Sequence, residues 1–164
     1  MNKQRGFTLV ELLVVIAIIA ILAGAVLLAI NPLAMMQKSR DATRLNDMDS
    51  LRNAITLALT EGEITLSAVG PFTSSVGTAQ LVNGTGWVRF GIPSGKTGLA
   101  KYIPTLPADP GANVYTFQST ATDFELNAVL EHPDNLVKMT ADGGNDATRY
   151  EVGTSLTIIS PVTP

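Results

Sequence analysis

Hydrophobic and polar positions divide the chain into an apolar N-terminal segment and a mixed remainder. From Phe7 to Ile30 every residue except Glu11 is uncharged, and nearly all are Leu, Val, Ile or Ala. A helix over 7–30 is about 36 Å long, whereas the hydrocarbon core of a membrane is about 30 Å thick. The pattern therefore predicts a membrane-spanning helix over 7–30 that is apolar on all of its faces.

The pattern then changes to that of an amphipathic helix. Pro32 removes a backbone donor and clashes with the preceding turn, so we expect a kink there rather than an end. Gly62 is expected to cap the helix, so that residues 7 to about 61 form one long helix with an amphipathic half over 31–62. Whether Gly24 breaks this helix or only allows close packing stays open. Apolar residues recur at three- and four-residue steps and are expected to pack on a sheet: Leu45, Met48, Leu51, Ile55 and Leu59.

Short strands are expected in the last third of the chain. Residues 63–106 are rich in Gly and Pro and are predicted to be loops, with 87–90 as one short extended candidate. Residues 114–118 and 123–130 alternate as a hairpin would, a turn begins at His132-Pro133, and 150–152 or 156–159 supplies a further strand. The sequence therefore predicts an α+β fold, with a long helix packed on three or four antiparallel strands over 107–164.

Three interpretations compete for the N-terminal segment. Lys3 and Arg5 are compatible with an ordinary signal anchor, and Ala23-Gly24-Ala25 has the small-x-small form of a secretory cleavage site. Neither explains Glu11, because an acidic residue inside a membrane-spanning helix is costly and usually has a partner. The third interpretation gives this carboxylate a role.

The stretch Gly6-Phe7-Thr8-Leu9-Val10-Glu11 resembles the processing site of type IV pilins and type II secretion pseudopilins. The resemblance implies a leader over 1–6, cleavage between Gly6 and Phe7 by a prepilin peptidase, and N-methylation of Phe7. In this family the glutamate, here Glu11, meets the N-terminal amine of a neighbouring identical subunit in a helical filament. The implied location is the cytoplasmic membrane, with its assembly machinery, and afterwards a periplasmic or extracellular filament.

Composition narrows the functional classes. The chain has no cysteine, so disulfides and thiol chemistry are excluded, and with one histidine a zinc site is not expected. The net charge of −3 argues against nucleic-acid binding by the monomer. No nucleophile or phosphate-binding motif is present, and we expect no enzymatic activity. The charged residues that follow the apolar segment are expected on a solvent-exposed face, with pairing between subunits as the alternative: Lys38, Arg40, Asp41, Arg44, Asp47, Asp49 and Arg52.

One loop offers candidate metal ligands. Asp142 and Asp146 flank Gly143-Gly144-Asn145, with Glu131 and Asp134 upstream, and Ca²⁺ prefers such oxygen ligands. Major pseudopilins have a calcium site in the loop before their final strand, and 142–146 looks similar in place and composition. A solvated turn is the alternative, and no other cofactor is indicated.

Two choices stay open at this level. The residues do not distinguish a pilus from a secretion pseudopilus, a major from a minor subunit, or adhesion, motility, DNA uptake and secretion. The alternative function is a signal-anchored periplasmic binding or enzyme domain, for which 7–30 is only a tether.

Overall fold

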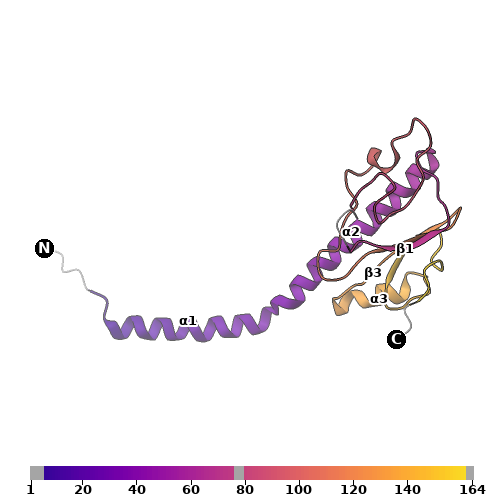
Figure 1. Ribbon diagram of the computed structural model, residues 1–164. Coiled ribbons are helices and arrows are strands. Elements are labelled where there is room, and N and C mark those ends of the chain that lie inside the picture. The colour runs from indigo at the N-terminus through magenta and orange to yellow at the C-terminus, as the bar shows by residue number, and fades with distance from the viewer. Residues whose placement is uncertain (1–5, 76–79, 162–164) are drawn as a thin grey trace. The chain divides into compact units, whose positions relative to one another are not determined.

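The computed structural model describes residues 6–75 and 80–161 and divides the chain into two compact units, residues 1–36 and 37–164. Helix α1 (Leu9–Ile30) belongs to the first unit (Figure 1). It is continuous through Gly24, so the break considered there does not occur. The helix begins two residues later than expected, because Thr8 is its extended N-cap.

The long helix is interrupted at one residue. Asn31 has φ 43° and ψ 76°, in the left-handed region, and α2 (Pro32–Thr60) begins directly after it. Proline disfavours the α conformation of the residue before it, asparagine tolerates the left-handed region, and Pro32 suits the first position of a helix. The expectation of one helix kinked at Pro32 is therefore wrong, since α1 ends at Ile30.

The end of α2 agrees with the prediction. Gly62 has φ +64°, and its N–H donates to the carbonyl of Leu59 over 3.1 Å. The N–H of Glu63 donates to the carbonyl of Ala58 over 2.8 Å. These two bonds form a Schellman motif, which satisfies carbonyls at the helix end.

The second unit contains a four-stranded antiparallel sheet in the order β1-β2-β3-β4. Strands β1 and β3 of this sheet are labelled in Figure 1. Its strands are β1 (Val69–Thr73), β2 (Thr116–Ser119), β3 (Phe124–Ala128) and β4 (Tyr150–Gly153). Phe117 pairs with Leu126, and Leu126 pairs with Val152 on the next strand. The predicted hairpin and the strand at 150–152 are confirmed.

Other elements differ from the prediction. Residues 87–90 and 156–159 are not strands, although Trp87, Phe90 and Ile159 are buried. Strand β1 lies in the stretch predicted to be loop, and η1 (Gly98–Lys101) is a short 3-10 helix there. The turn expected at His132-Pro133 is instead the start of α3 (Pro133–Ala141). His132 caps this helix, because its Nδ1 accepts the N–H of Asp134 over 3.2 Å.

The core lies between α2 and the sheet. Met48, Leu51 and Ile55 of α2 are buried in one cluster with Phe117 and Leu126 of the sheet. Their three- and four-residue spacing places them on one helix face, as the sequence predicts. The only tryptophan of the chain, Trp87, closes the cluster and donates its indole N–H to the carbonyl of Pro107 over 3.0 Å.

A buried arginine joins α2 to two distant segments. The Arg44 guanidinium is fully buried and donates to both carboxylate oxygens of Asp109, over 2.6 and 2.8 Å. It also donates to Asp41 over 3.0 Å and to Glu131 over 2.6 Å. Arg40 adds a second cation at Glu131. The expectation of a solvent-exposed face is wrong for Asp41 and Arg44, which face the interior.

Hydrogen bonds keep these groups charged in spite of burial. Burial disfavours the charged form of Asp41, but the N–H groups of Glu131 and His132 lower the pKa of this carboxyl overall. Burial likewise opposes ionisation of Glu131, whose pKa is lowered by its bonds to Arg40 and Arg44. Lowered folded-state pKa values stabilise the fold above the ordinary carboxyl pKa of about 4, and this stabilisation is lost as the pH falls through the folded values.

Replacing the buried guanidinium is therefore expected to lower the free energy of unfolding substantially. Arg44→Met leaves Asp41, Asp109 and Glu131 without their shared cation, at a cost of about 3–5 kcal/mol in the free energy of unfolding. Arg52→Met is the matched control, because its pair with Asp49 is about half exposed and such pairs contribute about 0–1 kcal/mol. Urea unfolding of the full chain in detergent, followed by Trp87 fluorescence, measures both. Equal stability of the two variants would contradict the role given to Arg44.

Candidate assembly site

The start of α1 holds its carboxylate in a capping box. The Glu11 Oε2 atom accepts the backbone N–H of Thr8 over 2.9 Å and the Thr8 hydroxyl over 2.7 Å. The Thr8 Oγ1 atom accepts the N–H of Glu11 over 3.2 Å in return. The arrangement is the Thr-x-x-Glu pattern that satisfies donors at a helix N-terminus. The pattern is visible in the sequence as Thr8-Leu9-Val10-Glu11 but is absent from the predictions above.

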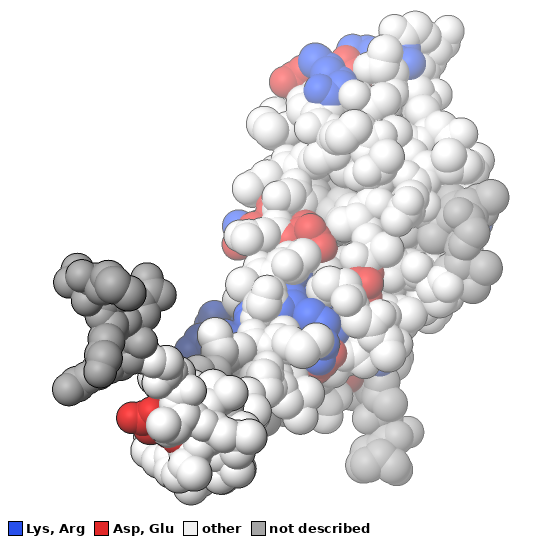
Figure 2. All heavy atoms as spheres, turned by 90° about the vertical axis from the view of Figure 1, so that its left-hand side faces the viewer, with Lys and Arg blue, Asp and Glu red and all other residues white. Residues whose placement is uncertain are grey.

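Glu11 is the only charged residue in 6–36. The large apolar side chains of α1 are exposed, for example Leu9 at 79% and Ile21 at 73%. Residues Leu9–Leu27 are long and apolar enough to cross a membrane. Figure 2 shows this unit as a mostly uncharged surface with one acidic group. The first unit therefore presents an apolar surface that requires lipid or other apolar partners.

The capping box occupies one side of the carboxylate. Both Thr8 donors bind Oε2, and the described residues provide no hydrogen bond to Oε1. In apolar surroundings such an oxygen is a site for a positively charged group, because attraction between charges is strong at low dielectric. An ammonium group is the simplest cation that would fit.

The predicted cleavage site lies just before the helix. Gly6 and Phe7 are outside α1, and Phe7 is 72% exposed. Nothing lies within 4 Å of the position a Gly6 Cβ would take. The bond between these two residues is thus accessible and not part of a helix. Leader residues 1–5 lie outside the described part of the chain.

The four predicted calcium ligands do not come together. Glu131 binds Arg40 and Arg44, and Asp134 pairs with Lys38 over 3.2 Å. Within residues 6–75 and 80–161, no group of three or more His, Cys, Asp or Glu side chains is arranged to hold a metal ion. Glu131 and Asp134 are thus engaged in ion pairs rather than available as calcium ligands.

Asp142 and Asp146 do lie near each other, around a glutamate that the sequence analysis missed. Asp142 accepts the N–H of Gly144 over 2.9 Å and that of Glu151 over 2.8 Å. The Glu151 carboxylate accepts the N–H of Asp146 over 3.0 Å. Burial raises the pKa of Glu151 to about 7, and the neighbouring Glu125 acts in the same direction. The sequence gives no sign that Glu151 is buried, because the pattern of β4 does not show which of its side chains face inward.

The described features define a class of protein. An exposed apolar helix of membrane-spanning length begins with a lone carboxylate and is followed by an α+β unit in which a helix packs on a four-stranded antiparallel sheet. This arrangement is consistent with the pilin fold.

Comparison with known proteins agrees with this class. Residues 1–27 match the family described as the prokaryotic N-terminal methylation motif. The chain is 30% identical to a fimbrial protein of Pseudomonas aeruginosa over 70% of its length and 75% of that protein. It is 32% identical to type II secretion system core protein G of Escherichia coli, over 81% of this chain and 84% of that protein. No solved structure gave a significant match.

The chain therefore belongs to the family of type IV pilins and type II secretion pseudopilins. Its function is that of a structural subunit of a pilus or pseudopilus. The predicted α+β fold and the resemblance found in the sequence are confirmed.

Calcium binding at Asp142 and Asp146 stays a prediction. Calcium is expected to raise the melting midpoint of the second unit, by an amount that grows with the ratio of free ion to Kd, and a chelator is expected to reverse the rise. Asp142→Asn removes one charge while keeping one acceptor oxygen, and should abolish the response. Trp87 fluorescence in detergent reports the midpoint. A midpoint that is the same with calcium and with chelator would exclude the site.

Proposed function

We propose that a prepilin peptidase cuts the Gly6–Phe7 bond, that the Phe7 amine is methylated, and that Glu11 binds the Phe7 amine of a neighbouring subunit in the filament. Membership of the family implies filament assembly and prepilin peptidase processing in general. The assignment to these residues is supported by the exposure of Gly6 and Phe7 before α1 and by the placement of Glu11 in the first turn of α1.

The observation that carries the proposal is the carboxylate with one capped oxygen in an apolar unit. An acidic residue at the centre of a membrane span costs about 2.5–3.5 kcal/mol, and less near an end. The two Thr8 donors replace part of its hydration, so the subunit can reside in the membrane before assembly. The amine of the next subunit then supplies the opposite charge, and registers that fail to pair the two leave the carboxylate unmatched.

Packing must supply the remaining driving force. Moving an apolar helix from lipid into a bundle of helices gains little from the hydrophobic effect. Close packing between helices and pairing of polar groups must therefore stabilise the bundle. Small residues along α1 permit such contact: Ala17, Ala20, Ala23, Gly24 and Ala25. The subunit would reside in the cytoplasmic membrane, be handled by the assembly machinery there, and end in a periplasmic or extracellular filament. It would have no enzymatic role.

The first test is the intact mass of the native protein. Mass spectrometry of the chain purified from membranes and from filaments is expected to show loss of residues 1–6 and one added methyl group on Phe7. An unprocessed Met1 would favour a plain signal anchor, and a start after Ala25 would favour a secretory peptide. Either result would contradict the proposed processing. Gly6→Leu, which places a bulky side chain at the cleavage site, is expected to keep the leader.

The second test separates charge from helix capping. Glu11→Gln keeps a side chain that serves the capping box, so membrane insertion should be unchanged. Loss of one partner of a buried charge pair costs about 2–5 kcal/mol, so filament yield should fall more than tenfold. Glu11→Asp keeps the charge and should assemble better than Glu11→Gln. Normal filaments from Glu11→Gln, counted by electron microscopy, would show that charge pairing is dispensable.

A further inference from the structure

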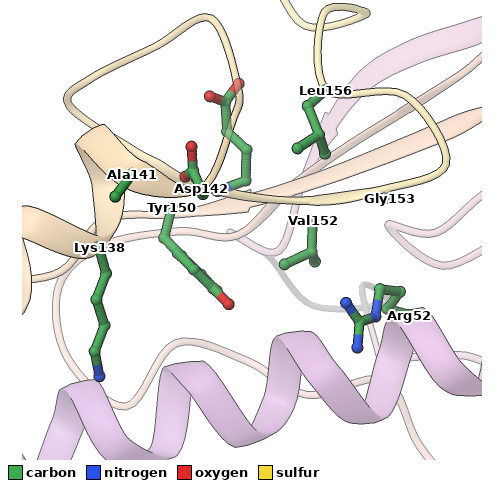
Figure 3. Close-up of a pocket in the computed structure, with 9 residues that line it drawn as sticks. Arg52, Lys138, Ala141, Asp142, Tyr150, Val152, Gly153 and Leu156 are labelled. Atoms are coloured by element: carbon green, nitrogen blue, oxygen red, sulfur yellow. Dashed lines mark hydrogen bonds between the residues drawn. The ribbon is translucent and has the colours of Figure 1, made fainter.

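A pocket of about 380 Å³ opens where α2, α3 and β4 meet in the second unit. Arg52 of α2 and Lys138 of α3 line it together with Tyr150 of β4. Val152 and Leu156 form an apolar wall. Figure 3 shows both cationic side chains on the side of α2, with Asp142 turned the other way. The pocket thus combines an apolar wall with a positively charged margin.

The cations of this margin lack strong partners. Among the described residues, no carboxylate lies within ion-pair distance of Lys138. In the described part of the chain Arg52 pairs only with Asp49, over 3.3 Å, and both side chains are about half exposed. The acids that line the pocket are already engaged, because Asp142 accepts two backbone N–H groups and Glu151 accepts one. The margin therefore suits a carboxylate from outside the unit.

One carboxylate of the second unit has no cationic partner among the described residues. Asp123 stands in the turn between β2 and β3, and its described hydrogen-bonding partner is the hydroxyl of Thr122, over 2.7 Å. No cation within the described part of the chain pairs with it. Phe124 begins β3 beside this turn, whereas Ala128 ends β3 opposite Tyr150, near the pocket. Asp123 and Lys138 therefore lie toward opposite ends of β3.

We propose that Asp123 of one copy of this chain docks at Lys138 of the next copy, at the margin of this pocket. This inference rests on the proposed filament function. A contact between two different patches is heterologous, and repeating it builds an open helical assembly when the rotation between copies does not close into a ring. The ion pair fixes which neighbour the head contacts, because a wrong register brings like charges together or leaves both groups unpaired. It adds a second electrostatic contact to that of Glu11, outside the membrane-spanning helix.

Cross-linking of wild-type filaments tests the contact directly. A carbodiimide joins a carboxylate to an amine with net loss of water and no spacer, so it reports touching groups. Filaments assembled from an equal mixture of ¹⁴N and ¹⁵N chains are expected to yield Lys138–Asp123 linked peptides with mixed labels. A link from Lys138 only to its own chain, to another carboxylate, or to a different protein would overturn the inference.

Charge exchange provides the second measurement. Lys138→Glu and Asp123→Lys are each expected to lower filament yield about fivefold or more, and the double variant is expected to recover most of it. Asp123→Asn keeps the acceptor for Thr122 without the charge and should show an intermediate loss. Lys138→Arg keeps the charge and should assemble normally. Trp87 fluorescence melting verifies that each variant folds.

The results of these experiments distinguish failure of the Asp123–Lys138 contact from failure of the proposed filament function. Normal filaments from both single variants would overturn the contact while leaving filament assembly intact. No recovery in the double variant would overturn it as well. Absence of filaments from the wild-type chain would reject the filament function, and this inference with it.

Discussion

The second unit depends on one buried cation. Arg44 projects from α2 into a site formed by Asp109, which lies before β2, and by Glu131, which lies before α3. Asp41 completes the site and also binds the backbone at Glu131 and His132. Moving these charges out of water is costly, and only a complete set of partners offsets that cost. The network therefore requires one arrangement of three segments distant in sequence, which a purely apolar core would specify less strictly.

Glu11 presents the opposite situation in the first unit. Arg44 finds all of its partners within the chain, whereas Glu11 finds donors only in Thr8 and no cation among the described residues. A charge removed from water needs partners to offset the cost. The described residues provide them for Arg44, whereas they provide no cation for Glu11. A carboxylate without a cation in an apolar unit is suited to assembly, because another copy of the chain can supply the positive charge. Membership of the pilin family and the position of Glu11 at the start of α1 thus both support the role of a filament subunit.

Much of the fold is predictable because its signals are local. The apolar segment, the stripe of Met48, Leu51 and Ile55, and the Gly62 cap all follow from spacing and conformational preference. The missed elements depend on longer-range context. Strand β1 contains Gly70 and Pro71 and exists because β2 offers a partner, with a bulge that accommodates them. At His132-Pro133 the signal is ambiguous, since proline begins helices as well as turns.

The candidate sites show where sequence reasoning fails for charged residues. Glu11 was identified because its apolar neighbours make a charge anomalous, but Asp41 and Arg44 sit among polar residues and resemble a solvated face. Glu131 was considered a calcium ligand, yet it binds Arg40 and Arg44, which precede it by 91 and 87 residues. The role of a charge is set by its partner, and partners are tertiary information. Lys138 has no such partner among the described residues, and the contact proposed for it is therefore with another copy of the chain.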